Sequence, residues 1–245
     1  MDKLCQSFLF ISLVLASPAS AQEQFPSDVI KTSSGDLLIT FIGHGSLMFA
    51  FGGKVIHVDP YSKLADYSKL PKADIVLITH EHRDHLDLVA LEKVRRDGTR
   101  VVLTGAGAGQ VTGGIVMKNG DRTTMEGIMV EAVPAYNIVG KRENGQPYHP
   151  RGAGNGYIIT FGDKRVYVAG DTENIPEMKG FKNIEIAFLP MNLPYTMTPE
   201  MVADASAMLQ PRVLYPYHTG DTDIAKLTAL MSGQKSTEIR IRRMQ

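Results

Sequence analysis

The chain has 245 residues, of which 26 are basic and 26 are acidic, so its formal net charge at pH 7 is zero. This balance, without a long run of either sign, argues against nucleic acid or an anionic membrane surface as the main partner. The single cysteine, Cys5, lies near the amino terminus, so the rest of the chain can form no disulfide and offers no thiol as a metal ligand or nucleophile.

The amino terminus has the composition of a secretory signal peptide. Lys3 precedes an apolar stretch at residues 8–16, and residues 19–21 form an A-x-A cleavage pattern. That stretch is too short to span a bilayer, and no later run is longer, so no membrane span is predicted. The prediction is a signal peptide at residues 1–21, then one domain at 22–245, secreted or periplasmic. A buried amino-terminal helix is the alternative.

The first half of the chain is predicted to be rich in β-structure. Residues 22–34 are polar and are predicted to form a loose leader. Strands are predicted at residues 36–43, 46–53, 54–60, 73–80 and 99–105, and the near-continuous apolar run at 73–80 is typical of a strand buried on both faces. Between the last two strands a helix is predicted from His85 to Gly98, because Leu88, Leu91 and Val94 share one stripe.

The second half repeats this pattern. Strands are predicted at residues 127–135, 156–162, 164–171, 184–190 and 212–218, with an edge strand at 238–243. A helix is predicted at residues 198–209, where Thr198 can cap the amino-terminal end and Pro199 fits the first turn, and another at 221–231. Sheet segments followed by helices favour an α/β sandwich, with helices outside two packed sheets.

Three of the seven histidines fall within the stretch ITHEHRDHLD, residues 78–87. In an extended segment the side chains of residues two apart point the same way, so His80 and His82 can bind one metal ion. Asp84 and His85 lie where the chain turns toward the predicted helix and can face a second ion. Imidazole and carboxylate ligands without sulfur suit Zn²⁺ first, with Mn²⁺ or Fe²⁺ as alternatives. A solvated polar loop is the competing interpretation.

The HEHRDH motif resembles the signature of the metallo-β-lactamase superfamily. Five further motifs occur in the expected order: GHGSL (43–47), VDP (58–60), VYVAGDT (166–172), AFLP (187–190) and PYH (216–218). The chain looks most like the branch of metal-dependent hydrolases related to ascorbate-6-phosphate lactonase. The resemblance implies a four-layer αβ/βα sandwich with a binuclear metal site at one edge.

The resemblance also implies a set of metal ligands. His80 and His82 would bind the first ion, and Asp84 and His85 the second. Asp171, which ends a predicted strand, would bridge both ions, and His218, at the end of another, would complete the second site.

A third ligand for the first ion is less evident. The family usually supplies a histidine between the helix and the AGDT strand, but Tyr136 and Asn137 occupy that place. His149 is the histidine that remains in the interval, and it is predicted to take the role. If His149 is instead a surface-loop residue, the first site would be vacant.

Such a site would activate a water molecule between two divalent ions for hydrolysis of a small-molecule ester, lactone or phosphodiester. Asp84 could hold the proton of that water. His44, in the turn IGHGS, could contact substrate or donate a proton to the leaving group, or it could be a plain turn residue. Asp59 resembles a carboxylate that orients a ligand imidazole, and His57 is predicted to be structural.

Other functions remain open at this point. A true β-lactamase is disfavoured, because Asp171 stands where many of those enzymes use cysteine. Flavodiiron redox chemistry is disfavoured, because those proteins have glutamate where this chain has His82. A non-catalytic metal-binding or partner-binding module is the further alternative. Lys141, Arg142 and Arg151 could recognise phosphate or belong to a solvated loop. The sequence gives no signal for oligomeric state.

Overall fold

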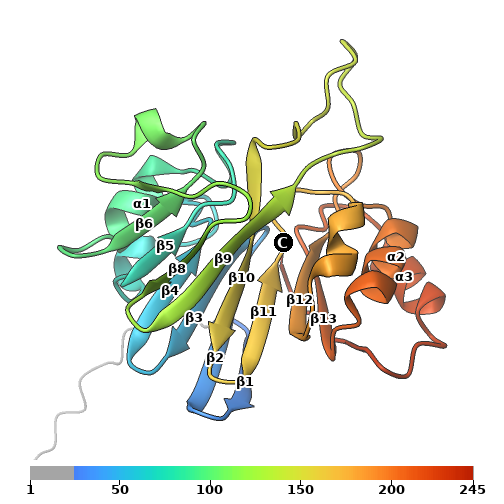
Figure 1. The fold of residues 1–245 in the computed structure, drawn as a ribbon, viewed down its shortest axis with the longest axis horizontal. Helices are drawn as coiled ribbons and strands as arrows, with labels where there is room; N and C mark the ends of the chain where they lie inside the picture. Colours follow the sequence, from blue (N-terminus) through green and yellow to red (C-terminus); the bar gives the residue numbers. More distant parts are fainter. Residues whose placement is uncertain (1–24, 245) are drawn as a thin grey trace, which may run out of the picture.

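The computed structural model describes residues 25–244, so the predicted signal peptide at residues 1–21 lies outside the described residues. The first half of the chain forms a seven-stranded sheet (Figure 1). Its strands are β1 (Ser27–Thr32), β2 (Gly35–Gly43), β3 (Ser46–Phe51), β4 (Lys54–Val58), β5 (Ile75–Leu77), β6 (Arg100–Leu103) and β7 (Ile115–Val116). Strands β1 to β4 pair antiparallel, and β4 to β7 pair parallel.

The second half forms another seven-stranded sheet with the same succession of pairings. Its strands are β8 (Arg122–Met125), β9 (Ile128–Ala135), β10 (Gly154–Phe161), β11 (Lys164–Val168), β12 (Ile184–Pro190), β13 (Val213–Tyr217) and β14 (Glu238–Ile239). Strands β8 to β11 pair antiparallel, and β11 to β14 pair parallel. The two halves are therefore built to one plan.

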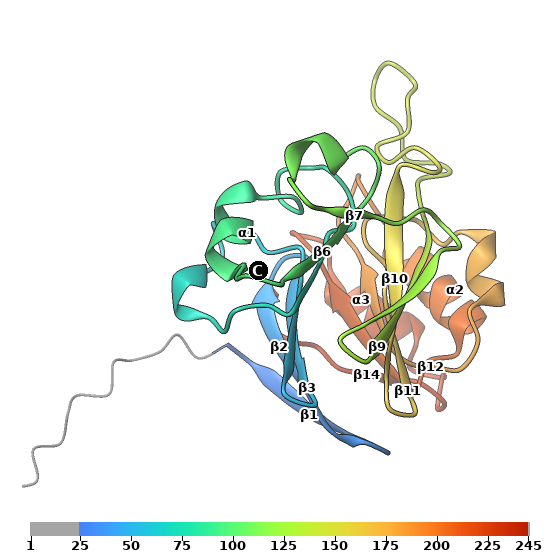
Figure 2. The same cartoon turned by 60° about the vertical axis from the view of Figure 1, so that its left-hand side comes forward.

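Helices cover the outer faces of the two sheets (Figure 2). Helix α1 (Leu88–Val94) lies on the first sheet, and α2 (Pro199–Leu209) and α3 (Ile224–Leu230) lie on the second. Short 3-10 turns occur at η1 (Tyr67–Lys69), η2 (Ala108–Gln110) and η3 (Pro176–Gly180). The order helix, sheet, sheet, helix confirms the predicted four-layer α/β sandwich. No helix within residues 25–244 combines the length and apolarity needed to cross a bilayer.

The interface between the sheets is aromatic. Phe41 of the first sheet lies 5.0 Å from Tyr215 of the second, between ring centroids, and Phe49 lies 5.5 Å from Phe161. All four side chains are almost completely buried. Tilted aromatic pairs of this kind add about 0.5–1.5 kcal/mol each beyond their area burial, so they help to fix how the sheets dock.

The predicted loose leader at 22–34 is wrong over most of its length, because residues 27–32 form β1. Its backbone pairs with β2, and Asp28 accepts hydrogen bonds from the guanidinium of Arg242 at 2.7 and 2.8 Å. A polar edge strand held by residues at the far end of the chain carries no local signal in the sequence.

The predicted helix at 85–98 is shorter than expected. The side chain of Asp87 accepts hydrogen bonds from Val89 N at 2.8 Å and Ala90 N at 3.2 Å, which starts α1 at Leu88. The backbone becomes extended at Arg95. His85 is consequently outside the helix, in the turn that precedes it.

His57 of β4 should make the fold sensitive to acid. Its ring is completely buried, and burial lowers its pKa to about 4, although a hydrogen bond to Pro71 O opposes the shift. Below about pH 6.5 His57 is protonated in the unfolded chain, whereas in the folded chain it stays neutral down to about pH 4. The free energy of unfolding therefore decreases by about 3 kcal/mol as pH falls from about 6.5 to 4. As pH is lowered, the free energy of unfolding, measured by urea denaturation, should fall by this amount more in the wild type than in His57→Gln. The same pH dependence in both proteins would contradict this prediction.

Candidate metal centre

The polar side chains predicted to bind metal meet at one edge of the two sheets. His80 follows β5, Asp171 follows β11 and His218 follows β13. His44 lies in the turn between β2 and β3, and His149 lies in the loop between β9 and β10. The carboxyl ends of neighbouring parallel strands lie at a common edge, which accounts for the convergence of segments that are far apart in sequence.

Two glycines allow the backbone to approach this edge closely. A Cβ atom at Gly45 would lie 3.1 Å from Cε1 of His85 and 3.5 Å from Cδ2 of His218. Gly170 has φ +65°, and a Cβ there would lie 2.8 Å from Asn155 O. The first glycine leaves room for the imidazoles, and the second lets the chain turn after β11 so that Asp171 faces them.

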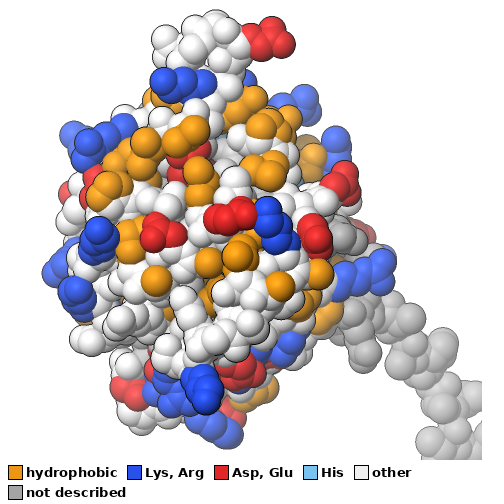
Figure 3. Space-filling view, turned by 90° about the vertical axis from the view of Figure 1, so that its right-hand side faces the viewer, with side chains coloured by type: hydrophobic (Ala, Val, Ile, Leu, Met, Phe, Trp, Pro, Cys, Tyr) orange, Lys and Arg blue, Asp and Glu red, His pale blue; other side chains and the backbone are white. Residues whose placement is uncertain are grey.

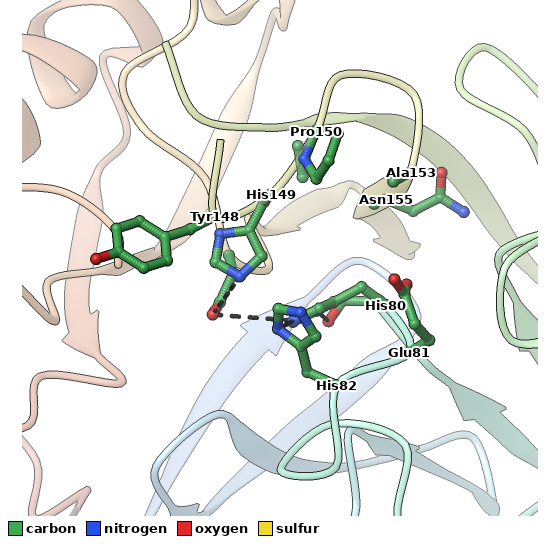
Figure 4. Close-up of a pocket in the computed structure, with 12 residues that line it drawn as sticks. His80, Glu81, His82, Tyr148, His149, Pro150, Ala153 and Asn155 are labelled. Atoms are coloured by element: carbon green, nitrogen blue, oxygen red, sulfur yellow. Dashed lines mark hydrogen bonds and ion pairs between the residues drawn. The ribbon is translucent and has the colours of Figure 1, made fainter. Parts of the chain in front are cut away.

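The first group of donors consists of His80, His82 and His149 (Figure 4). The three side chains point toward one another, and one ring nitrogen from each lies within 4.8 Å of the others. His80 Nε2 lies 3.0 Å from His82 Nδ1. The structure thus brings together the two histidines of the motif and the loop histidine that the sequence analysis selected.

Asn137 orients the ring of His149. Its Oδ1 accepts hydrogen bonds from His149 N at 2.8 Å and from His149 Nδ1 at 2.7 Å. With Nδ1 directed at this oxygen, Nε2 is the ring nitrogen that faces the other donors, and it lies 3.3 Å from Asp171 Oδ2. A ligand imidazole held through its other nitrogen is typical of protein metal sites.

Glu173 fastens the segment that carries Asn137. Its buried carboxylate accepts hydrogen bonds from the backbone N–H groups of Ile138, Val139 and Gly140 at 2.7, 2.8 and 2.6 Å. It also accepts a hydrogen bond from Asn137 Nδ2 at 3.1 Å. The loop between β9 and β10 is therefore tied to the residues that follow Asp171, and we call Asn137 and Glu173 together the loop clamp.

The second group consists of His44, Asp84, His85 and His218. His44 Nε2 lies 3.0 Å from Asp84 Oδ2, and His85 Nε2 lies 3.3 Å from His218 Nε2. Burial opposes ionisation of Asp84, but the hydrogen bond from His44 and the charge of His85 hold its pKa below the ordinary value. Burial lowers the pKa of His218 to about 4, so this imidazole is neutral and can act as a ligand.

His85 lies between two carboxylates. Its Nδ1 donates to Asp59 Oδ2 at 2.8 Å, and its Nε2 lies 3.5 Å from Asp171 Oδ1. Burial alone would lower the pKa of His85, but the charges of Asp171 and Asp59 raise it to about 10. Binding of a cation at Nε2 is therefore expected to release a proton.

Asp171 joins the two groups. Its Oδ2 lies 3.3 Å from His149 Nε2 and 3.9 Å from His80 Nε2, whereas its Oδ1 lies 3.5 Å from His218 Nε2. Oδ1 is buried without a hydrogen-bond partner among residues 25–244. Donors around one tetrahedral zinc ion are about 3.3 Å apart, so the spacing of these residues fits ligation of divalent cations.

Three further residues that the sequence suggests for the site lie around the donor groups or away from them. Asp59 contacts the imidazole of His85, as the sequence analysis predicted for it, and it also accepts hydrogen bonds from Thr79. Arg142 borders the donor groups, but Arg151 pairs with Glu177 at 2.6 Å. The loop clamp was missed, because its two residues are 36 positions apart and neither belongs to a recognisable motif.

Comparison with known proteins gives consistent matches. Residues 38–218 match the model of the family described as the β-lactamase superfamily domain. A UPF0173 metal-dependent hydrolase of Enterococcus faecalis is 33% identical over 190 residues, covering 72% of this chain and 84% of the relative. A similar hydrolase of Thermococcus kodakarensis is 30% identical over 193 residues, covering 74% of this chain and 83% of the relative.

A solved structure agrees over most of the fold. A protein of Parabacteroides distasonis, described as a metal-dependent hydrolase, is 50% identical with a TM-score of 0.86, covering 91% of this chain and 100% of that one.

Proposed function

The chain belongs to the metallo-β-lactamase superfamily, and from this premise we propose that it is a hydrolase that uses two divalent metal ions to cleave an ester, lactone or phosphodiester. The single observation that supports this best is the carboxylate of Asp171, whose two oxygens face different groups of imidazoles. The names of its relatives support the class of reaction.

In this proposal His80, His82 and His149 hold one ion, and Asp84, His85 and His218 hold the other, with Asp171 shared. When bound, such ions lower the pKa of a water molecule toward neutrality and polarise the bond under attack. Zn²⁺ suits this set of donors best, and Mn²⁺ or Fe²⁺ are alternatives.

Two side chains of the protein are placed to transfer the proton of the attacking water. Asp84 has a side chain that is 37% exposed, so its carboxylate can accept a proton from the attacking water. His44 shares a 3.0 Å hydrogen bond with that carboxylate and can pass a proton to the leaving group. We assign these two residues to acid–base chemistry.

Cleavage of a lactone or phosphodiester is favoured over that of a β-lactam, because the shared ligand is Asp171 and the described residues contain no cysteine. The relationship to ascorbate-6-phosphate lactonase remains a prediction from the motifs. The signal-peptide pattern of residues 1–21 supports a secreted or periplasmic location for the enzyme.

Metal analysis together with turnover tests this function. We expect about two zinc or manganese ions per purified chain and hydrolysis of at least one chromogenic ester, lactone or phosphodiester, lost on chelation and restored by metal. Metal without hydrolysis of any member of the panel would favour a binding module. Bound iron with oxygen reduction would favour redox chemistry instead.

A further inference from the structure

Two cavities open beside the candidate metal centre, and Arg83 and Asp84 border both of them. One cavity of about 470 Å³ lies against the imidazoles and extends to Arg142 and Tyr195. The other, of about 690 Å³, passes His44 and extends to Lys63. A substrate that reaches the donor groups must therefore contact residues of these two cavities, which we call the cleft.

The basic side chains of the cleft are not neutralised. Lys63, Arg83 and Arg142 form no ion pair with a carboxylate within the described part of the chain. The guanidinium of Arg142 lies 5.3 Å from the ring centroid of Tyr148, and Lys63 Nζ lies 5.8 Å from that of Tyr61. These charges remain available to a ligand, although the same two cavities are also lined by three carboxylates: Asp84, Asp87 and Asp171. Two of these carboxylates belong to the donor groups and would be offset by bound cations, which leaves the basic side chains to attract an anionic group.

Apolar side chains are concentrated at the same place. Of the eleven large hydrophobic side chains exposed among residues 25–244, three line the cleft: Leu88, Val89 and Tyr195. Three more lie on adjoining segments, Ile138 and Val139 directly after Asn137 and Leu193 two residues before Tyr195. Figure 3 shows hydrophobic side chains gathered below the loop that projects at the top of the face carrying α2 and α3.

A hydrogen bond and a close approach of the backbone bring two of these apolar segments together. Asn137 Nδ2 donates to Tyr195 O at 2.8 Å, and a Cβ at Gly140 would lie 3.3 Å from Pro194 O. The loop clamp therefore holds Ile138 and Val139 beside Leu193 and Tyr195. Val139 is 67% exposed. A single exposed valine is ordinary, but a group of exposed apolar side chains held side by side is typical of a surface that receives an apolar ligand.

We propose that the substrate is an amphipathic anion, in which a phosphate or carboxylate group is joined to an acyl chain or an aryl group. The anionic group would face Arg142 and Arg83 beside the metal ligands, and the apolar group would lie on the exposed side chains at the rim. This inference rests on the proposed function, since it takes the cleft as the place where the substrate binds.

Binding of non-hydrolysable ligands to the zinc-loaded chain tests the inference separately from turnover. By titration calorimetry, octylphosphonate should bind at least about tenfold more tightly than methylphosphonate, because each buried methylene adds to affinity. It should also bind at least about tenfold more tightly than octan-1-ol, which lacks the charge. Octanoate compared with octylphosphonate decides whether carboxylate or phosphate is the preferred group.

Substitutions in the cleft test whether its side chains cause these differences in affinity. Arg142→Gln should weaken octylphosphonate binding about tenfold, and Val139→Ser should reduce the advantage of the longer chain. Lys235→Gln and Val29→Ser, which remove an exposed charge and an exposed valine elsewhere, are the matched controls. Equal affinity for octylphosphonate, methylphosphonate and octanol would overturn the inference. Preferential binding without hydrolysis of any substrate would overturn only the proposed function.

Discussion

Replacing Asp171 with asparagine is expected to lower kcat/KM by about 10³-fold or more, with the fold retained. The amide has nearly the same size and shape as the carboxylate, so packing in the turn after β11 should change little. It is neutral, however, and it cannot present an anionic oxygen to each of the two groups of imidazoles. The variant should lose both the shared ligand and the charge that offsets two cations.

The measurement is kcat/KM on the ester or phosphodiester that the wild type cleaves best, with metal content and circular dichroism recorded for the same samples. Asp97→Asn is the matched control, because Asp97 is an exposed carboxylate in the turn after α1. Wild-type kcat/KM together with two bound ions in Asp171→Asn would show that Asp171 is not the shared ligand.

The second large effect is expected at His149 and at Asn137, the residue of the loop clamp that orients it. His149→Ala should lower metal content from two ions to one per chain, since it removes a donor from the group that also contains His80 and His82. Asn137→Leu should weaken metal binding at this group about 10–100-fold, because leucine has a similar volume but cannot accept the hydrogen bond from His149 Nδ1. The remaining group should keep its ion in both variants.

A double variant distinguishes positioning from general damage to the loop. If Asn137 acts through His149, then Asn137→Leu should add no further loss of metal affinity once His149 is alanine. The visible spectrum of the Co²⁺-loaded chain should report the change of coordination in each single variant. Asn144→Ala, in the same loop, is the control, because the side chain of Asn144 is exposed and accepts a hydrogen bond from Gln146 N. Additive losses in the double variant would show that Asn137 acts independently of His149.

Much of the fold follows from local sequence. The buried strands are continuous apolar runs, and the start of α2 is set by Thr198, whose side chain accepts a hydrogen bond from Met201 N at 3.2 Å. These features depend on neighbouring residues only. By contrast, β1 is polar and depends on Asp28 meeting Arg242, which lies 214 positions away. No window of the sequence contains both partners.

The candidate site shows the same division. The spacing of residues 80–85 indicates four donors, and the family resemblance adds Asp171 and His218, which both end predicted strands. The selection of His149 rested on elimination among few histidines, and the geometry that brings it to His80 comes from the loop clamp. The hydrogen bonds of Glu173 to three successive backbone N–H groups arise only after folding, so they could not be predicted.

The repeated plan of the two sheets has a consequence for how the enzyme would mature. Neither half contains a full set of donors: His85 comes from the first, and His218, which lies 133 residues later, comes from the second. In a nascent chain the donors therefore cannot come together until both halves have been synthesised and have docked. Cofactor acquisition would follow folding rather than direct it.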